Sequence, residues 1–145
     1  MNMFNDLESV QNKILIPVAF HKLVRFRNHA GIILGNDSKK FAIYVNPLAG
    51  QLIQSLPAEE KRPSTHTLIN YLLNGLDAKV VQLIINNYEN KVFFSRLFVE
   101  QIKDGILHTT DTDARPSDGI ILSLIYDVPI YCVSDVFEKT IPYED

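Results

Sequence analysis

Three β-rich segments follow one another in the sequence, at residues 80–85, 92–99 and 106–113, with no helical pattern between them. β-Branched and aromatic residues fill much of the first two, and threonines and alternating polar residues make up much of the third. Parallel strands need a crossover connection of about a dozen residues or more, which these links do not supply. The spacing therefore predicts an antiparallel meander, with its first turn at residues 86–90.

Strands are also predicted on both sides of this meander. Short apolar runs lie at residues 13–20, 30–34 and 41–45, and the last two flank a Gly-Asn-Asp-Ser sequence that is typical of a turn. A further apolar run at residues 129–133 predicts a buried strand near the end of the sheet-forming sequence. The segments at residues 13–20, 30–34 and 41–45 are expected to form antiparallel pairs that begin the sheet.

Helical patterns occupy three of the remaining stretches. Leucines at every fourth position of residues 48–56 predict a short helix that stops before Pro57. Residues 116–127 predict a helix that is apolar on most sides, with Pro116 suited to its first position. A short helix is expected at about residues 134–139.

A fourth helix is predicted after Pro63, where Ser64 or Thr65 can accept hydrogen bonds from free backbone N–H groups. It carries one apolar stripe and ends at residues 75–77. The stripe consists of Leu68, Ile69, Leu72, Leu73 and Leu76.

This order of segments favours an α+β fold: a mixed, largely antiparallel sheet packed with three to four helices. The 145 residues are 46% hydrophobic, which is enough for one sizeable core, and they contain neither an internal repeat nor a linker rich in Gly, Ser or Pro. We therefore expect residues 1–145 to form a single domain.

The charge pattern allows two interpretations. The net charge of -3 argues against a protein that coats nucleic acid over its whole surface. Residues 1–80 hold nine basic against six acidic side chains, whereas the remainder is acidic. These charges are either solvated faces and tails, or a basic patch opposite an acidic patch that attracts metal ions.

The longest stretch without charged side chains, residues 41–58, is interrupted by Asn46, Pro47 and Gly50, so no membrane-spanning segment is expected. Cys132 is the only cysteine, which makes a reducing cytoplasm the expected compartment. The high apolar fraction beside few charges suggests that a second copy of the chain covers some apolar surface, in a homodimer.

The densest polar segment is Asp-Thr-Asp-Ala-Arg-Pro-Ser-Asp at residues 111–118, where a strand meets a helix. On a strand, Asp111 and Asp113 share a face with Cα atoms about 6–7 Å apart. With Asp118 from the helix start they could bind Mg²⁺ or Mn²⁺, and Arg115 offers a planar fork for phosphate. The alternative is an ordinary helix start without a ligand, in which Arg115 pairs with Asp113.

A second segment, Arg-Pro-Ser-Thr-His at residues 62–66, again places a basic residue before a helix start. Arg62 is a candidate for binding phosphate. His66 is a candidate general acid or base, or a metal ligand. The alternative for His66 is a ring that caps or packs against the helix end.

Three segments together resemble the bifunctional nuclease domain family. They are Ile-Tyr-Val-Asn-Pro at 43–47, Arg-Pro-Ser-Thr-His at 62–66, and Asp-Ala-Arg-Pro-Ser-Asp-Gly-Ile at 113–120 followed by Val-Pro-Ile-Tyr at 128–131. The resemblance covers about residues 31–139. It implies a compact α+β domain, commonly a homodimer, with nuclease activity on RNA and DNA.

Two positions depart from the family pattern. Ala49 and Thr67 stand where the family usually has acidic residues. Two candidate carboxylates are therefore missing.

The resemblance leads to two hypotheses. The first is a metal-assisted phosphodiesterase, in which Asp113 and Asp118, with Asp111 as a further ligand, hold the divalent cation. Arg115 and Arg62 then bind phosphate and His66 transfers a proton. The second is a non-catalytic dimeric module that binds a partner protein or a small anionic ligand at the same surface.

Overall fold

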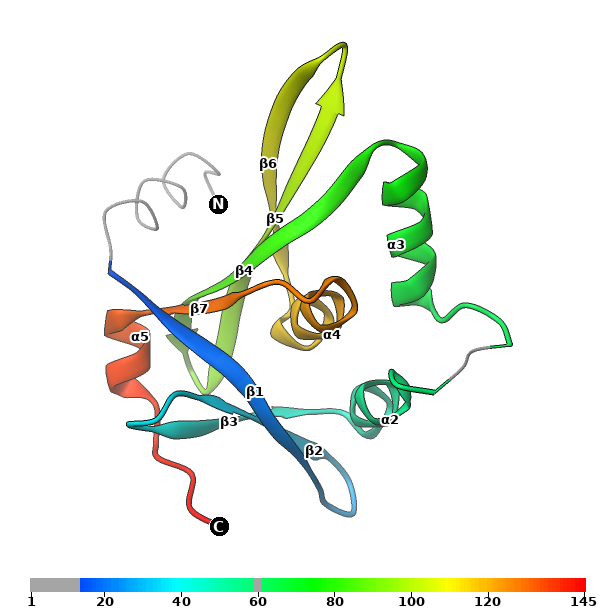
Figure 1. The fold of residues 1–145 in the computed structure, drawn as a ribbon. Coiled ribbons are helices and arrows are strands. Elements are labelled where there is room, and N and C mark those ends of the chain that lie inside the picture. Colours follow the sequence, from blue (N-terminus) through cyan, green and yellow to red (C-terminus); the bar gives the residue numbers. More distant parts are fainter. Residues whose placement is uncertain (1–13, 59–60) are drawn as a thin grey trace.

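The computed structural model describes residues 14–58 and 61–145 and places seven strands in one sheet, in the order β3-β2-β1-β7-β4-β5-β6 (Figure 1). The strands are β1 (Leu15–Arg25), β2 (Ala30–Gly35), β3 (Lys40–Val45), β4 (Ala78–Glu89), β5 (Val92–Lys103), β6 (Ile106–Ala114) and β7 (Ile130–Val133). The helices of the described part are α2 (Pro47–Ser55), α3 (Thr65–Gly75), α4 (Pro116–Tyr126) and α5 (Ser134–Lys139).

The sheet is mixed and largely antiparallel, which confirms the predicted α+β class. Its one parallel contact joins β4 to β7, and every other neighbouring pair is antiparallel. Strands β4, β5 and β6 form the predicted meander. Strand β7 lies between β1 and β4 and joins the first three strands to this meander.

The prediction of a turn at residues 86–90 was wrong. Strand β4 continues to Glu89, which pairs with Val92, so only Asn90 and Lys91 form the turn. Both have positive φ angles, of 52° and 64°, as in the two-residue turns that match the twist of a β-hairpin. Strand β4 thus continues through two asparagines that have a low intrinsic preference for strands: Asn86 lies at a change of register, and Asn87 pairs with Phe94.

The first strand is longer than predicted. It runs beyond Phe20 to Arg25, with a change of register between Phe20 and Lys22 that marks an irregularity in its pairing with β2. The predicted strand start, Lys13, lies outside the described residues.

Helix α4 packs on the sheet and also contacts α2 and α3, which explains its apolar sequence. Ile120 and Ile121 are buried, and Gly119 lies very close to β4. A Cβ atom at Gly119 would be 2.5 Å from a methyl carbon of Leu83, which is itself fully buried. The sheet therefore fixes the position of the α4 N-terminus.

The apolar stripe of α3 is divided between the core and the surface. Ile69 and Leu73 pack against the core, but Leu68, Leu72 and Leu76 are exposed, by 47% to 61%. The helix is present as predicted, with Ser64 as its N-cap. Among the described residues, no helix has the length and apolar character needed to cross a membrane.

Candidate polar site at the starts of α3 and α4

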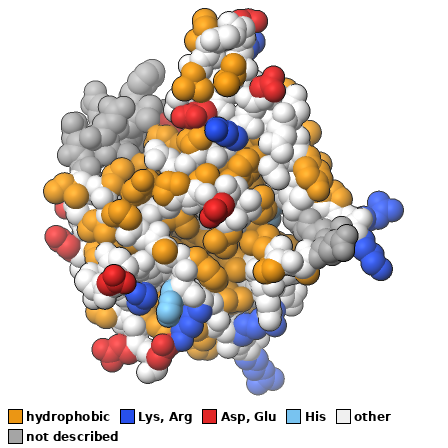
Figure 2. All heavy atoms as spheres, viewed as in Figure 1, with side chains coloured by type: hydrophobic (Ala, Val, Ile, Leu, Met, Phe, Trp, Pro, Cys, Tyr) orange, Lys and Arg blue, Asp and Glu red, His pale blue; other side chains and the backbone are white. Residues whose placement is uncertain are grey.

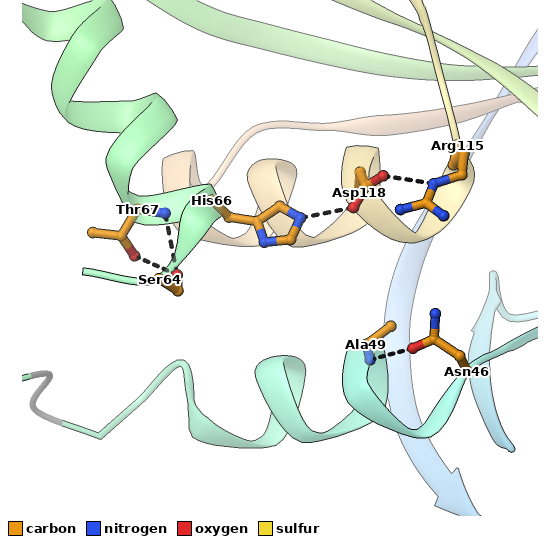
Figure 3. A network of polar contacts seen from close by, with 7 residues as sticks. All are labelled: Asn46, Ala49, Ser64, His66, Thr67, Arg115 and Asp118. Carbon is orange, nitrogen blue, oxygen red and sulfur yellow. Dashed lines mark hydrogen bonds and ion pairs between the residues drawn. The ribbon is translucent and has the colours of Figure 1, made fainter. Parts of the chain in front are cut away.

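The N-termini of α3 and α4 are joined by a hydrogen bond between side chains far apart in the sequence (Figure 3). His66 is the second residue of α3 and Asp118 is the third residue of α4. The distance from Nε2 of His66 to Oδ1 of Asp118 is 2.8 Å. The two polar segments singled out in the sequence therefore meet at one place.

Arg115 completes this network from the N-cap position of α4. Its Nε donates to Oδ2 of Asp118 over 2.9 Å. The Arg115 side chain is 75% exposed, compared with 35% for Asp118. Its two terminal amino groups make no hydrogen bond to a described residue, so they remain available to an anion in solution.

The environment of Asp118 favours its ionised form. Burial alone raises the pKa of this carboxyl, but hydrogen bonds from His66 and Arg115, together with their charges, outweigh it and lower the pKa below its usual value. Asp118 is therefore a carboxylate at neutral pH.

The His66 ring is held in one orientation. The His66 side chain is only 9% exposed. An ionised carboxylate only accepts, so Nε2 carries the hydrogen of the bond to Asp118. Nδ1 is buried and has no hydrogen-bond partner among the described residues. A proton that passes between His66 and solvent therefore has its most direct route through Asp118.

Asp111 lies in a different ion pair. Nε of Arg96, on β5, donates to Oδ2 of Asp111, on β6, over 2.8 Å. Both side chains are more than nine-tenths buried, at 7% and 8% exposed. This pair bridges two strands of the meander and does not belong to the network around Asp118.

Asp113 also lies apart from the network. It is exposed on β6, where it faces Arg96 in the strand register, and its carboxylate makes no ion pair with a described residue. The alternative in which Arg115 pairs with Asp113 was wrong, because Arg115 bonds to Asp118 instead. The i, i+3 spacing at the first helical turn favours that choice over a bond back to the strand.

The three aspartates do not form a preassembled metal site. Each Asp118 oxygen already accepts a hydrogen bond, and Asp111 is paired with Arg96. In residues 14–58 and 61–145, no three His, Cys, Asp or Glu side chains are grouped closely enough to hold a metal ion. The donor set thus does not fit the predicted binding of Mg²⁺ or Mn²⁺ without rearrangement.

Arg62 lies just before the start of α3. It is exposed and makes no hydrogen bond or ion pair with a described residue. Ser64, two residues later, begins the helix, since its Oγ accepts the N–H of Thr67 over 3.2 Å. The structure therefore leaves the Arg62 guanidinium exposed beside the start of α3, apart from the hydrogen bonds that join His66, Asp118 and Arg115.

The family comparison agrees with the three segments seen in the sequence. A family model described as the bifunctional nuclease domain matches residues 32–143. The chain belongs to this family. The match covers the three segments and confirms the resemblance expected over about residues 31–139. No curated protein matches the chain.

The two positions where the family resemblance led us to expect acidic residues occupy equivalent places in two helices. Ala49 and Thr67 are each the third residue of a helix, and their N–H groups bond to the N-caps Asn46 and Ser64. Asp118 is the third residue of α4. At the same position of these three helices, therefore, this chain has a carboxylate only in α4.

A pocket of about 570 Å³ opens next to Arg115 and lies between β3, the β4–β5 turn and the residues after α5. Tyr44, Tyr88, Phe93 and Tyr143 are among the residues that line it. The sequence analysis did not indicate this pocket. The missing information is tertiary: residues 140–143 fold back across β3, where the Tyr143 N–H donates to the Lys40 carbonyl over 2.7 Å.

Proposed function

We propose that this protein hydrolyses phosphodiester bonds of RNA or DNA at the starts of α3 and α4. The observation that carries this proposal is the ionised Asp118 carboxylate, held between a buried imidazole and an exposed guanidinium. It lies in the segments that mark the bifunctional nuclease domain, whose name describes nuclease activity. This is an arrangement of a base, a group that orients it, and a cation for phosphate.

Arg115 binds the substrate phosphate in this proposal. Its terminal amino groups donate to two non-bridging oxygens and stabilise the negative charge that develops on them. Arg62 adds a second positive charge near the start of α3. The positive charges reduce the repulsion between the phosphate and an attacking water molecule.

Asp118 acts as the base. It accepts a proton as the oxygen of a water molecule attacks phosphorus, and it returns that proton to the leaving oxygen as the phosphorus–oxygen bond breaks. His66 orients the carboxylate through Oδ1, and any proton transfer by His66 passes through Asp118. No step of this scheme passes through a metal ion.

The test compares the cleavage of single-stranded RNA and DNA by variants at two different aspartates. Asp118→Asn keeps the shape of the side chain but removes its basicity, and we expect cleavage to fall at least a hundredfold. Asp37→Asn, at an exposed turn between β2 and β3, is the matched control and should cleave like the wild type. Equal cleavage by the wild type and Asp118→Asn would contradict the proposal.

Two further arms address the metal hypothesis. Cleavage is measured with Mg²⁺, with Mn²⁺ and with a chelator, and Asp113→Ala is measured beside Asp118→Asn. Activity that persists in chelator supports the scheme above. Activity that requires the cation and Asp113 supports a rearranged metal site instead.

The alternative function, a non-catalytic interaction module, is favoured by an exposed apolar surface. Besides the exposed leucines of α3, Tyr71 is 57% exposed, and the nearby β5–β6 hairpin exposes Ile102, Ile106 and Leu107. The two parts are connected, because the Ile102 N–H donates to the Asp77 carbonyl just after α3. Figure 2 shows hydrophobic side chains at the tip of this hairpin.

A second copy of the chain is the proposed occupant of this surface, in a homodimer. Sedimentation at micromolar concentration tests it: the wild type should sediment as a dimer and Leu72→Glu as a monomer. A module of this kind would remain dimeric and show no cleavage in any of the assays above. The same surface is present in a dimeric nuclease, so the cleavage assay decides between the two functions.

We also propose the cytoplasm as the compartment. Cys132 is fully buried in β7, and burial raises the pKa of its thiol to about 12. The thiol is therefore protonated and shielded from reaction. A chain with one shielded thiol has no structural need for an oxidising compartment.

A further inference from the structure

The pocket beside Arg115 combines flat rings with positive charge. Arg115 and Lys91 lie at its wall, and none of its described lining residues is acidic. Tyr88 and Phe93 are packed together with their ring centroids 4.4 Å apart, and Tyr44 is 61% exposed. Rings bind a flat base and cations bind phosphate, which are the two parts of a nucleotide.

A second aromatic surface continues from this pocket. Tyr44 lines the pocket and also contacts His29 edge-on, with ring centroids 5.5 Å apart. His29 stacks on Phe26 at 4.6 Å, and Arg25, at the end of β1, and Arg27, in the β1–β2 turn, are both exposed. In Figure 2, Lys and Arg side chains lie at the lower right of the molecule, where Figure 1 places this hairpin, while the lower left edge also carries Asp and Glu side chains.

Basic side chains interleaved with exposed rings are the pattern that binds single-stranded nucleic acid, because bases stack on the rings and phosphates follow the charges. A double helix would keep its bases inside and offer little to these rings. The volume of about 570 Å³ is in the range of sites for small organic ligands, so it accommodates one nucleotide and not a stacked series.

We propose that the pocket binds one nucleotide of a single-stranded RNA or DNA substrate, and that the strand continues over Tyr44 to Phe26 and His29. Its phosphate is held by Arg115 and Lys91, and its base lies against the rings of the pocket. This inference rests on the proposed function, since it places the nucleotide next to the phosphodiester bond that is cleaved at Asp118.

Binding is measured with adenosine 5′-monophosphate, which has no internucleotide bond to cleave, and compared with adenosine and with inorganic phosphate. We expect the nucleotide to bind at least tenfold more tightly than either part. Equal binding of nucleotide and phosphate would overturn the pocket and leave only non-specific attraction of anions.

Two tyrosines of similar exposure form a matched pair. Tyr44→Ala removes a ring of the pocket, and we expect it to weaken nucleotide binding at least fivefold. Tyr71→Ala, on α3 and outside the pocket lining, should leave binding unchanged. The same loss in both variants, or in neither, would overturn the proposal.

Lys91→Gly tests the charge without straining the turn, because glycine suits the positive φ at this position. We expect nucleotide binding to weaken about two- to fivefold while adenosine binding stays the same. Lys79→Ala, exposed on β4, is the control and should change neither.

Phe26→Ala tests the path of the strand. Phe26 lies outside the pocket lining, so the variant should bind the mononucleotide as the wild type does. Its binding of a labelled single-stranded oligonucleotide should be at least fivefold weaker. The oligonucleotide should also displace the mononucleotide from the wild type. Failure to displace it would show that the pocket takes free nucleotides, and would overturn the assignment to the substrate strand.

The pocket and the proposed function fail separately. A wild type that binds nucleotide with the expected Tyr44 dependence but cleaves nothing contradicts the nuclease and leaves the pocket standing. If the wild type cleaves and Tyr44→Ala retains full cleavage activity, the pocket proposal is contradicted and the nuclease proposal is not.

Discussion

Two arginine–aspartate ion pairs lie between residues 96 and 118 of the sequence and differ in how far water reaches them. Arg96 and Asp111 are both more than nine-tenths buried, whereas Arg115 is three-quarters exposed and Asp118 is one-third exposed. The N–O distances are almost the same, at 2.8 and 2.9 Å. Distance alone therefore does not separate a pair that holds two strands together from a pair that can meet a ligand.

The difference lies in what surrounds each charge. A buried pair has already lost its water, so removing one partner leaves a charge without compensation. An exposed pair keeps much of its water and contributes little to stability. The first pair should therefore matter for folding and the second for binding and chemistry.

The largest effect is expected for Asp111→Ala. It leaves the Arg96 guanidinium buried and unpaired, and we expect the free energy of unfolding to fall by about 3–5 kcal/mol. Urea unfolding followed by circular dichroism measures this loss. A loss below about 1 kcal/mol would mean that water reaches Arg96 and that the two pairs are alike.

Arg115→Ala should show the opposite behaviour. We expect the free energy of unfolding to change by less than about 1 kcal/mol, because the side chain is mostly exposed. Oligonucleotide cleavage should fall at least tenfold, since the phosphate loses its bidentate donor. A variant that unfolds easily but cleaves normally when folded would reverse the comparison.

Replacing both members of the buried pair sharpens the same point. Nη2 of Arg96 has no hydrogen-bond partner among the described residues, so this pair is incompletely satisfied. We expect Arg96→Met with Asp111→Leu to recover most of the loss caused by Asp111→Ala, to within about 1–2 kcal/mol of the wild type. The same urea measurement tests it, and a double variant less stable than Asp111→Ala would contradict it.

The smallest effect concerns pH. The folded-state pKa of Asp118 is lowered, so its ionised form stabilises the fold above the unfolded pKa, and this contribution is lost as pH falls through the folded value. Asp118→Asn lacks this contribution. The stability difference between the wild type and Asp118→Asn, below about 1 kcal/mol at neutral pH because the site is partly exposed, should shrink on acidification. A difference that stays constant between neutral pH and about pH 3 would contradict the assignment.

The sequence was sufficient to locate the two helix starts that form the network. Pro116 and Ser64 mark where α4 and α3 begin, and the residue types around them singled out His66, Arg115 and Asp118, which the structure brings together. These are local signals, in which a side chain and a nearby backbone decide the outcome.

The partner of Asp111 could not be predicted in this way. Asp111 and Asp113 look equivalent in the sequence. The register of β5 against β6 places Asp113 directly opposite Arg96, yet the ion pair forms on the diagonal, with Asp111. Register depends on contacts between distant segments, as does the pocket that residues 140–143 help to close. The exposure of Leu68, Leu72 and Leu76 on α3 could not be predicted for the same reason. A helical pattern shows which residues share a face, but contacts with distant segments decide which of them are covered.

The place of β7 has a consequence for the order of folding. Strand β1 (Leu15–Arg25) precedes β2 to β6 in the chain, whereas its neighbour in the sheet, β7 (Ile130–Val133), follows them and is synthesised later. During synthesis the first three strands and the β4–β6 meander can each form local hairpins, yet the strand that joins them emerges only after both. Contacts of such long sequence separation slow folding, so the sheet is expected to close in a late step, after strands β1 to β6 have left the ribosome.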